Sequence, residues 1–399
     1  MAAFLVPSPQ PLVPNPFLPV PQYTRILLIE DDPDDVWVMR NLLADSWDGV
    51  NELTHVERLE TALKLCQKRE FDVILLDLTL PDSHGIETFL RAYAQVPHIP
   101  IVILTALNDQ SAANQAVEGG AEDFLLKGRV DDHLLLRSIR YAVERSRRRK
   151  AENDLQATRH EFQLARTMQQ RLFPSGPPNV PGFRFSGATY PAEATGGDLF
   201  DYFPMLGGGW GIVIADVSEH GIGPSFLMAE TRAYIRALAR SHADAGVILT
   251  EANRLLCEDT AGTQFVTLVL ARLEPESKTL VYAAAGHIGF LFNAAGECRR
   301  LDSTSQPLGF DPDLIVPCAD PIQLAAGDLV LLATDGVYEA PSPDGSMFGL
   351  ERMLNVVREN RDLPPQSIVD NLRHAVGRFS QPLAQIDDIT IVALQVAGR

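Results

Sequence analysis

The sequence predicts an α/β domain with a doubly wound parallel sheet, a helical linker, and an α+β domain in which a β-sandwich is covered by helices. Three observations lead to this prediction. From Arg25 to about residue 146, short apolar runs alternate with amphipathic stretches, which is the pattern of parallel strands joined by helical crossovers. The chain then continues to Leu172 without Gly or Pro, which indicates one long helix. From residue 180 onward, strand-like runs are grouped apart from longer helical patterns, as in α+β folds.

The length and charge of the chain limit its organisation and its partners. Its 399 residues exceed one ordinary hydrophobic core, so we expect two domains. With 52 acidic and 34 basic residues the formal net charge is −18, which disfavours nucleic acids and anionic membranes as partners. No uninterrupted apolar run reaches the roughly 18 residues of a membrane span. The cysteines show neither CxxC spacing nor a dense framework, so we expect free thiols in a cytoplasmic protein.

The first 22 residues are expected to form a disordered or polyproline II tail. Seven prolines lie between Pro7 and Pro21 and exclude the helical segment of a signal peptide. A basic segment at the start is missing as well.

The first domain is expected to span residues 23–146. Its strand-like runs are Ile26–Ile29, Val73–Leu76, Ile101–Leu104 and Asp123–Leu126, and the amphipathic stretches are 35–45, 57–69 and 111–118. The runs do not alternate between apolar and polar residues, which indicates strands buried on both faces. In such folds ligands bind beyond the carboxyl ends of the strands.

Charged and hydroxyl side chains follow the strands of the first domain. The first strand ends in Glu30-Asp31-Asp32, and later strands end in Asp77, Thr105 and Lys127. Carboxylates from adjacent strand ends repel one another unless a divalent cation lies among them. A lysine and a hydroxyl group opposite them suit a phosphoryl group. The pattern therefore predicts an aspartate that becomes phosphorylated.

These residues resemble the response-regulator receiver family over about residues 23–146, which has a flavodoxin-like fold. The resemblance implies that Asp77 is the phosphoacceptor and that Glu30, Asp31 and Asp77 hold one Mg²⁺. It also implies a sensor histidine kinase as a partner.

The same resemblance assigns the residues around the phosphoryl group. Thr105 and Lys127 would bind it, and Phe124 stands where the family carries its switch aromatic residue. Gly128 departs from the family, in which a proline usually follows the lysine, and this leaves the rigidity of the last loop open.

The linker is expected to span residues 147–174 as a helix that begins near Asp131. Apolar and polar positions repeat every seven residues at Leu155, Phe162 and Gln169, and at Thr158, Ala165 and Leu172. This repeat is compatible with a homodimer through a short coiled coil and equally with a helix packed on its own domain. The basic residues 145–150 fit a solvated helical face better than a nucleic-acid site. Pro174, Pro177 and Pro178 end the helix.

The second domain is expected to span residues 175–399, with helices near 224–240, 246–257, 349–359 and 365–378. Aspartates stand beside strands or glycines at four stations: Gly196-Gly197-Asp198, Asp216-Val217, Asp335-Gly336 and Asp387-Asp388. Glycine permits close backbone approach, and carboxylates that gather at one point need hard cations between them. The stations therefore predict a metal centre.

This domain resembles the metal-dependent PPM phosphatases of the SpoIIE and RsbU type. The matching motifs occur in the family's order: GGDLFD, DVSEHG, AGH at 285–287, QPLGF at 306–310, LLATDGVYEA at 331–340, and DDIT at 387–390. The resemblance implies a protein-serine/threonine phosphatase that uses two Mn²⁺ or Mg²⁺ ions. Oxygen donors without a cysteine or histidine cluster agree with these hard cations.

Carried over by position, the resemblance makes Asp198, Asp216, Asp335 and Asp387 metal ligands together with the carbonyl of Val217, while Asp388 competes with Asp387. Gly197, His220, Gly336 and His287 are candidates for a supporting role around the metal ions. The two histidines are as compatible with loop packing as with proton donation. Glu219 stands where the family more often has glycine, which either shifts the loop or adds a carboxylate at the rim.

The combined prediction is a two-component response regulator whose output is a phosphatase. Phosphorylation of Asp77 would control it through the linker, and the resemblance suggests a phosphorylated anti-sigma-factor antagonist or a similar protein as substrate. The alternative is a non-catalytic adaptor that binds a regulatory partner, although all four aspartate stations are occupied. A DNA-binding regulator is disfavoured because no helix-turn-helix follows the receiver and the net charge is acidic.

Overall fold

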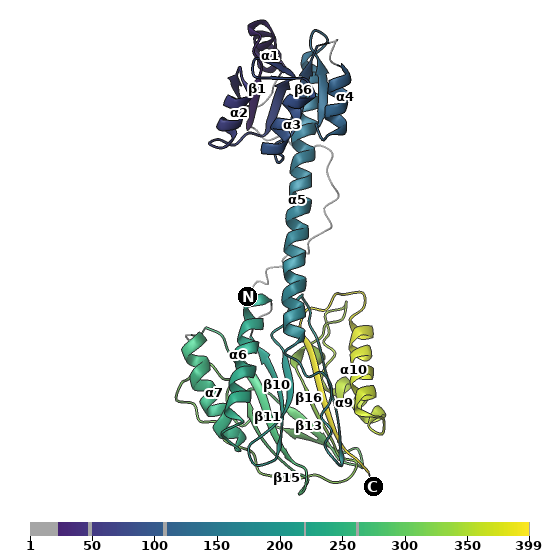
Figure 1. Ribbon diagram of the computed structural model, residues 1–399. Coiled ribbons are helices and arrows are strands. Elements are labelled where there is room, and N and C mark those ends of the chain that lie inside the picture. The colour runs from purple at the N-terminus through teal and green to yellow at the C-terminus, as the bar shows by residue number, and fades with distance from the viewer. Residues whose placement is uncertain (1–22, 47–49, 107–109, 219–220, 261–262, 399) are drawn as a thin grey trace, which may run out of the picture. The chain divides into compact units, whose positions relative to one another are not determined.

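The structure is a computed structural model that describes residues 23–46, 50–106, 110–218, 221–260 and 263–398 (Figure 1). The predicted N-terminal tail lies outside the described residues. The chain divides into two compact units, Met1–Ala157 and Thr158–Arg399.

The first unit contains a parallel sheet with the strand order β2-β1-β3-β6-β7. The strands are β1 (Tyr23–Ile29), β2 (Val50–Val56), β3 (Val73–Asp77), β6 (Ile101–Thr105) and β7 (Asp123–Leu126), and a small hairpin consists of β4 (Thr79–Leu80) and β5 (Ser83–His84). The helices are α1 (Pro33–Ser46), α2 (Leu59–Cys66), α3 (Ile86–Gln95), α4 (Gln110–Glu118) and the start of α5 (Asp132–Gln170). This order confirms the predicted doubly wound, flavodoxin-like sheet.

Helices cover both faces of this sheet because its central strands are apolar on both sides. In β1, Leu27 and Ile29 pack toward α2, α3 and α4, whereas Ile26 and Leu28 pack toward α1 and α5. The carboxyl ends of the strands therefore remain as the edge where a ligand site can form.

Helix α5 has 39 residues and belongs to both units. Leu135 and Ile139 near its start are buried in the first unit, and Gln169 near its end is buried in the second. Residues 147–164 between them are exposed. In the basic segment, Arg145 and Arg149 form ion pairs with Glu122 at 3.1 and 2.7 Å. These ion pairs within the first unit agree with the expected solvated face.

The second unit is a sandwich of two five-stranded antiparallel sheets. One sheet has the order β15-β12-β11-β10-β9, with β9 (Leu199–Pro204), β10 (Trp210–Val217), β11 (Val266–Glu274), β12 (Thr279–Ala285) and β15 (Ile322–Gln323). The other has the order β14-β13-β16-β17-β8, with β8 (Phe183–Tyr190), β13 (Gly289–Phe292), β14 (Cys298–Leu301), β16 (Leu329–Ala333) and β17 (Ile389–Val396). The helices are α6 (Ile222–Leu238), α7 (Ala245–Thr260), α8 (Asp335–Tyr338), α9 (Leu350–Asn360) and α10 (Pro365–Ser380).

The sheets bury both of their faces, which explains their continuous apolar runs. In β10, Ile212 and Ile214 face the core between the sheets, while Val213 and Ala215 face the layer of α6 and α7. Helices α8, α9 and α10 cover the outer face of the other sheet (Figure 1). This arrangement confirms the predicted helix-covered sandwich.

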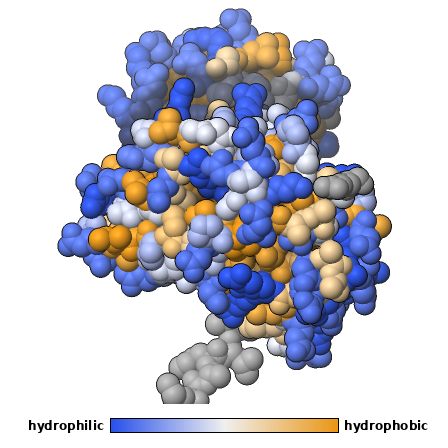
Figure 2. Space-filling model, turned by 90° about the horizontal axis from the view of Figure 1, so that it is seen from below, coloured by the Kyte–Doolittle hydropathy of each residue, from blue (hydrophilic) through white to orange (hydrophobic). Residues whose placement is uncertain are grey.

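The surface seen from below shows hydrophobic residues in several patches separated by hydrophilic ones (Figure 2). Scattered exposed hydrophobic residues are normal on folded proteins and by themselves mark no function. Among the described residues, none of the helices combines the length and hydrophobicity needed to cross a lipid bilayer.

Candidate functional site

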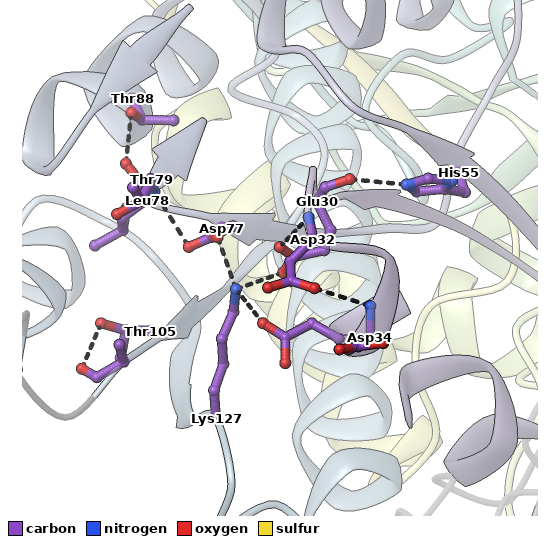
Figure 3. Close-up of polar contacts among 12 residues, drawn as sticks. Glu30, Asp32, Asp34, His55, Asp77, Leu78, Thr79, Thr88, Thr105 and Lys127 are labelled. Carbon is purple, nitrogen blue, oxygen red and sulfur yellow. Dashed lines mark hydrogen bonds and ion pairs between the residues drawn. The ribbon is translucent and has the colours of Figure 1, made fainter. Parts of the chain in front are cut away.

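In the first unit, the predicted residues meet at the carboxyl edge of the parallel sheet (Figure 3). The Nζ atom of Lys127 lies 2.7 Å from Asp77 Oδ2 and 2.7 Å from Glu30 Oε2. It also lies 2.9 Å from Asp35 Oδ2, a contact from the first turn of α1 that the strand-end pattern did not predict. Lysine and carboxylates therefore share one small site.

The acidic residues of this edge are close enough to share a cation. Glu30, Asp31 and Asp77 offer ligand atoms that all lie within 4.8 Å of one another. Glu30 is fully buried, and burial raises its pKa to about 7 although Lys127 opposes the shift. A divalent cation would stabilise the ionised form of this carboxyl group, so the donor set fits Mg²⁺.

The remaining residues of the edge lie on neighbouring strands. Thr105 is buried at the end of β6, and its backbone carbonyl accepts a hydrogen bond from the Lys127 amide at 2.8 Å. Phe124 in β7 packs against the core layer of α2, α3 and α4. Gly128 has φ +79°, a conformation closed to proline, whose ring holds φ near −65°. A proline at this position would therefore not fit the backbone of the last loop.

In the second unit, the four aspartate stations come together at one end of the sandwich. Asp198 precedes β9, and Asp216 lies next to the last residue of β10, which pairs antiparallel with β9. Asp335 begins α8 directly after β16, and Asp387 and Asp388 precede β17, the partner of β16.

In this aspartate centre, burial and then neighbouring carboxylates raise the pKa values of Asp198 and Asp216. Burial, followed by the charges of Asp335, Asp387 and Asp388, raises the pKa of Asp216 to about 8. The pKa of Asp198 is raised by burial and by the charge of Asp216. Buried carboxylates at one point are destabilising without a counter-charge, and a hard divalent cation supplies one. The donor set therefore fits Mn²⁺ or Mg²⁺.

Two glycines of the stations are required by close contacts. A Cβ atom on Gly196 would lie 2.1 Å from Asp388 Oδ2, and one on Gly336 would lie 1.9 Å from the Asp388 carbonyl oxygen. Gly197 is less tightly enclosed, because a Cβ atom there would lie 3.0 Å from the Val217 carbonyl oxygen. Any side chain at Gly196 or Gly336 would displace the loops that carry the aspartates.

The aspartate doublet divides into two environments. Asp388 is buried, and its carboxylate accepts hydrogen bonds from the backbone amides of Ala192 at 2.8 Å and Gly197 at 2.7 Å. Asp387 is exposed, and its Oδ1 atom accepts a hydrogen bond from the Asp388 amide at 2.8 Å. Asp388 therefore anchors the loop before Asp198, whereas the Asp387 carboxylate is exposed beside it, and metal binding by Asp387 stays a prediction.

Alanine at Asp387 is expected to weaken metal binding, whereas alanine at Asp388 is expected to lower the stability of the fold. Asp387→Ala should weaken Mn²⁺ binding at least about tenfold and leave the melting temperature of the metal-free protein unchanged, because it removes a ligand from an exposed position. Asp388→Ala should lower the free energy of unfolding by about 1–3 kcal/mol, because buried amides lose their acceptor. Calorimetric metal titration and thermal unfolding measure the two effects. Equal loss of stability in both variants would contradict this division.

The two histidines fall differently in the structure. His287 is buried, its Nδ1 atom lies 3.1 Å from Thr267 Oγ1, and burial lowers its pKa to about 4. Thr267 pairs with Asp216 across β10 and β11, so His287 contacts a direct neighbour of the aspartate centre. His220 and Glu219 lie outside the described residues.

Two further residues contact the aspartate centre without having been assigned to it. The Thr334 hydroxyl group donates a hydrogen bond to Asp198 Oδ2 at 2.8 Å and accepts one from the Thr390 amide at 3.0 Å. Thr334 lies directly before Asp335 in the motif LLATDGVYEA, so its position in the sequence could have indicated a role at the aspartate centre.

At Gln169, the seven-residue repeat agrees with the second of the two expected arrangements, a helix packed on its own domain. Gln169 is buried, its Nε2 atom donates to the Gly196 carbonyl at 2.6 Å, and its Oε1 atom accepts from the Gly196 amide at 3.1 Å. At this position the helix packs on its own unit rather than forming a seam, because both polar atoms of the side chain are satisfied there. Leu155 and Phe162 of the repeat are exposed.

Comparison with known proteins finds a family model that matches part of each unit. Residues 26–140 match the family model of the response regulator receiver domain, and residues 207–397 match that of stage II sporulation protein E (SpoIIE). Protein IcfG of Synechocystis sp. is 27% identical over 265 residues, which are 59% of this chain and 41% of IcfG. The phosphoserine phosphatase RsbU of Bacillus subtilis is 25% identical over 244 residues, which are 60% of this chain and 71% of RsbU.

A solved structure shares the fold of the second unit. The SiaA-PP2C domain of Pseudomonas aeruginosa aligns with a TM-score of 0.54 at 21% identity and covers 61% of this chain and 98% of that domain. The chain thus spans nearly all of this domain but less than half of the length of IcfG.

Proposed function

We propose that this chain, which joins a response-regulator receiver domain to a phosphatase domain of the SpoIIE family, removes phosphate from phosphoserine or phosphothreonine of a partner protein. The observation that carries the proposal is the aspartate centre, in which burial and the charges of neighbouring aspartates raise the pKa values of Asp198 and Asp216. The likeness to the phosphoserine phosphatase RsbU supports the substrate class. Multiple turnovers of a phosphoserine peptide in the presence of Mn²⁺ would exclude a non-catalytic adaptor.

The proposed metal ligands are Asp198, Asp216, Asp335 and Asp387 with the Val217 carbonyl. Bound divalent ions would activate water and offset the negative charge of the transferred phosphoryl group. The chain's own contribution is to hold the donors in place. Thr334 fixes one oxygen of Asp198, and the anchor of Asp388 on Gly197 holds the adjoining loop.

We further propose that phosphorylation of Asp77 controls this activity through helix α5. Lys127, which now forms ion pairs with Asp77 and Glu30, would then pair with the phosphoryl group on Asp77. Helix α5 begins five residues after Lys127 and ends beside Gly196, which Gln169 holds by two hydrogen bonds. Gly196 is two residues from Asp198, so a change in the last turn of α5 acts on a proposed metal ligand.

Alanine at Gln169 is expected to lower turnover by about tenfold, because Gly196 would lose a donor and an acceptor worth about 1–3 kcal/mol while buried. The matched control is Gln170→Ala, which alters the exposed neighbour on the same turn and should keep normal turnover. Rates on a phosphoserine peptide and the Mn²⁺ concentration for half-maximal activity measure the effect. Equal rates in the two variants would contradict a role of Gln169 in linking helix α5 to the aspartate centre.

Domain limits and partners complete the proposal. We assign residues 23–146 to the receiver, 147–174 to the linker and 175–399 to the phosphatase. A sensor histidine kinase would phosphorylate Asp77, and a phosphorylated protein similar to an anti-sigma-factor antagonist would be the substrate. The exposed residues 147–164 of α5 leave room for a homodimer through the linker.

A further inference from the structure

An apolar cavity of about 260 Å³ opens beside the aspartate centre. Its apolar walls come from the loop after α8, from α10, and from the segment that leads to β17: Ala340, Pro341, Val376, Leu383, Ile386 and Ile389. Gly336 and Asp387 also line it, and both belong to the aspartate stations. The cavity therefore borders the proposed catalytic site.

A glycine in the last turn of α10 lines this cavity. Gly377 lines the cavity, and a Cβ atom added to it would meet no atom within 4 Å. Glycine inside a helix is less stable than alanine, and neither a positive φ nor a close contact requires it here. A larger side chain at this position would therefore extend into open space at the cavity wall.

The segment beside the cavity is fixed although its apolar side chains are exposed. Leu383 is 43% and Ile386 is 64% exposed. Between them, the Gln385 side chain donates hydrogen bonds to the carbonyl oxygens of Tyr190 at 2.5 Å and Asp387 at 2.8 Å. Exposed apolar side chains on a fixed segment are suited to contact a partner.

We infer that this cavity receives an apolar side chain of the phosphoprotein substrate, from a residue next to or near the phosphorylated one. The inference rests on the proposed function. Extended chain advances about 3.3 Å per residue, so a phosphate held at the aspartates places neighbouring residues at the cavity mouth. The carboxylates of Glu339 and Asp387 in the wall disfavour acidic side chains there. The cavity thus selects substrates with an apolar residue at a flanking position.

Peptides that carry one phosphoserine between glycines test this selection, compared with peptides in which leucine or aspartate occupies each neighbouring position in turn. For the wild-type chain with Mn²⁺, leucine at one position should raise kcat/KM at least about tenfold, mostly by lowering KM, and aspartate should lower it. No preference for leucine at any position would overturn the inference.

Filling the cavity should abolish the preference. In Gly377→Leu, the ratio of kcat/KM between the leucine and glycine peptides is expected to fall to about one. Leu383→Ser, a change at an exposed wall position, should also reduce the ratio and guards against misfolding of the first variant. His374→Leu adds the same side chain at an exposed position of α10 outside the cavity and should keep the wild-type ratio. An unchanged ratio in the first two variants contradicts the inference, whereas no turnover of any peptide by wild type contradicts the proposed function itself.

Discussion

Replacing Asp216 or Asp335 with alanine is expected to lower the turnover of a phosphoserine peptide by about a thousandfold or more. Loss of a metal ligand removes several kcal/mol of transition-state stabilisation, and about 4 kcal/mol corresponds to a thousandfold change in rate. The fold should persist, because burial raises the pKa of both carboxyl groups, so in the absence of metal they do not stabilise the fold as ions.

The matched control for these variants is Asp320→Ala, which removes an exposed aspartate of the same domain. Its turnover should equal that of the wild type. A chelator should silence the wild-type enzyme, and Mn²⁺ should restore it better than Ca²⁺, which prefers larger and more flexible oxygen sites. Normal turnover in Asp216→Ala or Asp335→Ala, or activity that survives thorough chelation, would contradict a metal-dependent reaction at the aspartate centre.

Replacing Asp77 with asparagine is expected to abolish incorporation of phosphate from a small acyl-phosphate donor. The amide group cannot form the acyl phosphate, whereas in the wild type a cation held by Glu30 and Asp31 would screen the approach of the dianion. Lys127, now within 2.7 Å of Asp77 Oδ2, would pair with the attached group. Intact-mass measurement with and without Mg²⁺ records the modification.

The control for this second variant is Asp34→Asn, which removes an exposed carboxylate from α1 without touching the strand ends. It should be phosphorylated like the wild type. Phosphate found on the Asp77→Asn chain would show that another residue accepts it.

The sequence predicted best what depends on local pattern. Apolar runs located four strands of the parallel sheet. The positions of Glu30, Asp77 and Lys127 at strand ends correctly predicted that their side chains lie close together. Strand β2 was not located because it is an edge strand with polar residues, and the lysine contact of Asp35 was not predicted because it comes from a helix turn rather than from a strand end.

Contacts between distant segments were not readable from the sequence. The sequence did not distinguish the two members of the doublet Asp387-Asp388, since the backbone amides that hold Asp388 belong to Ala192 and Gly197. Gln169 resembled a polar position in a repeat because its partner, Gly196, lies 27 residues further along the chain. Such contacts follow from the tertiary fold rather than from spacing in the sequence.

The most direct test of a phosphatase controlled by its receiver is one rate measurement on the full chain. Turnover of a phosphoserine peptide with Mn²⁺ is measured before and after treatment with the acyl-phosphate donor, in the wild type and in Asp77→Asn. The account predicts that treatment changes the wild-type rate severalfold, with the sign read from the same data, and leaves the variant unchanged. Equal wild-type rates before and after complete phosphorylation, or an equal change in Asp77→Asn, would contradict it.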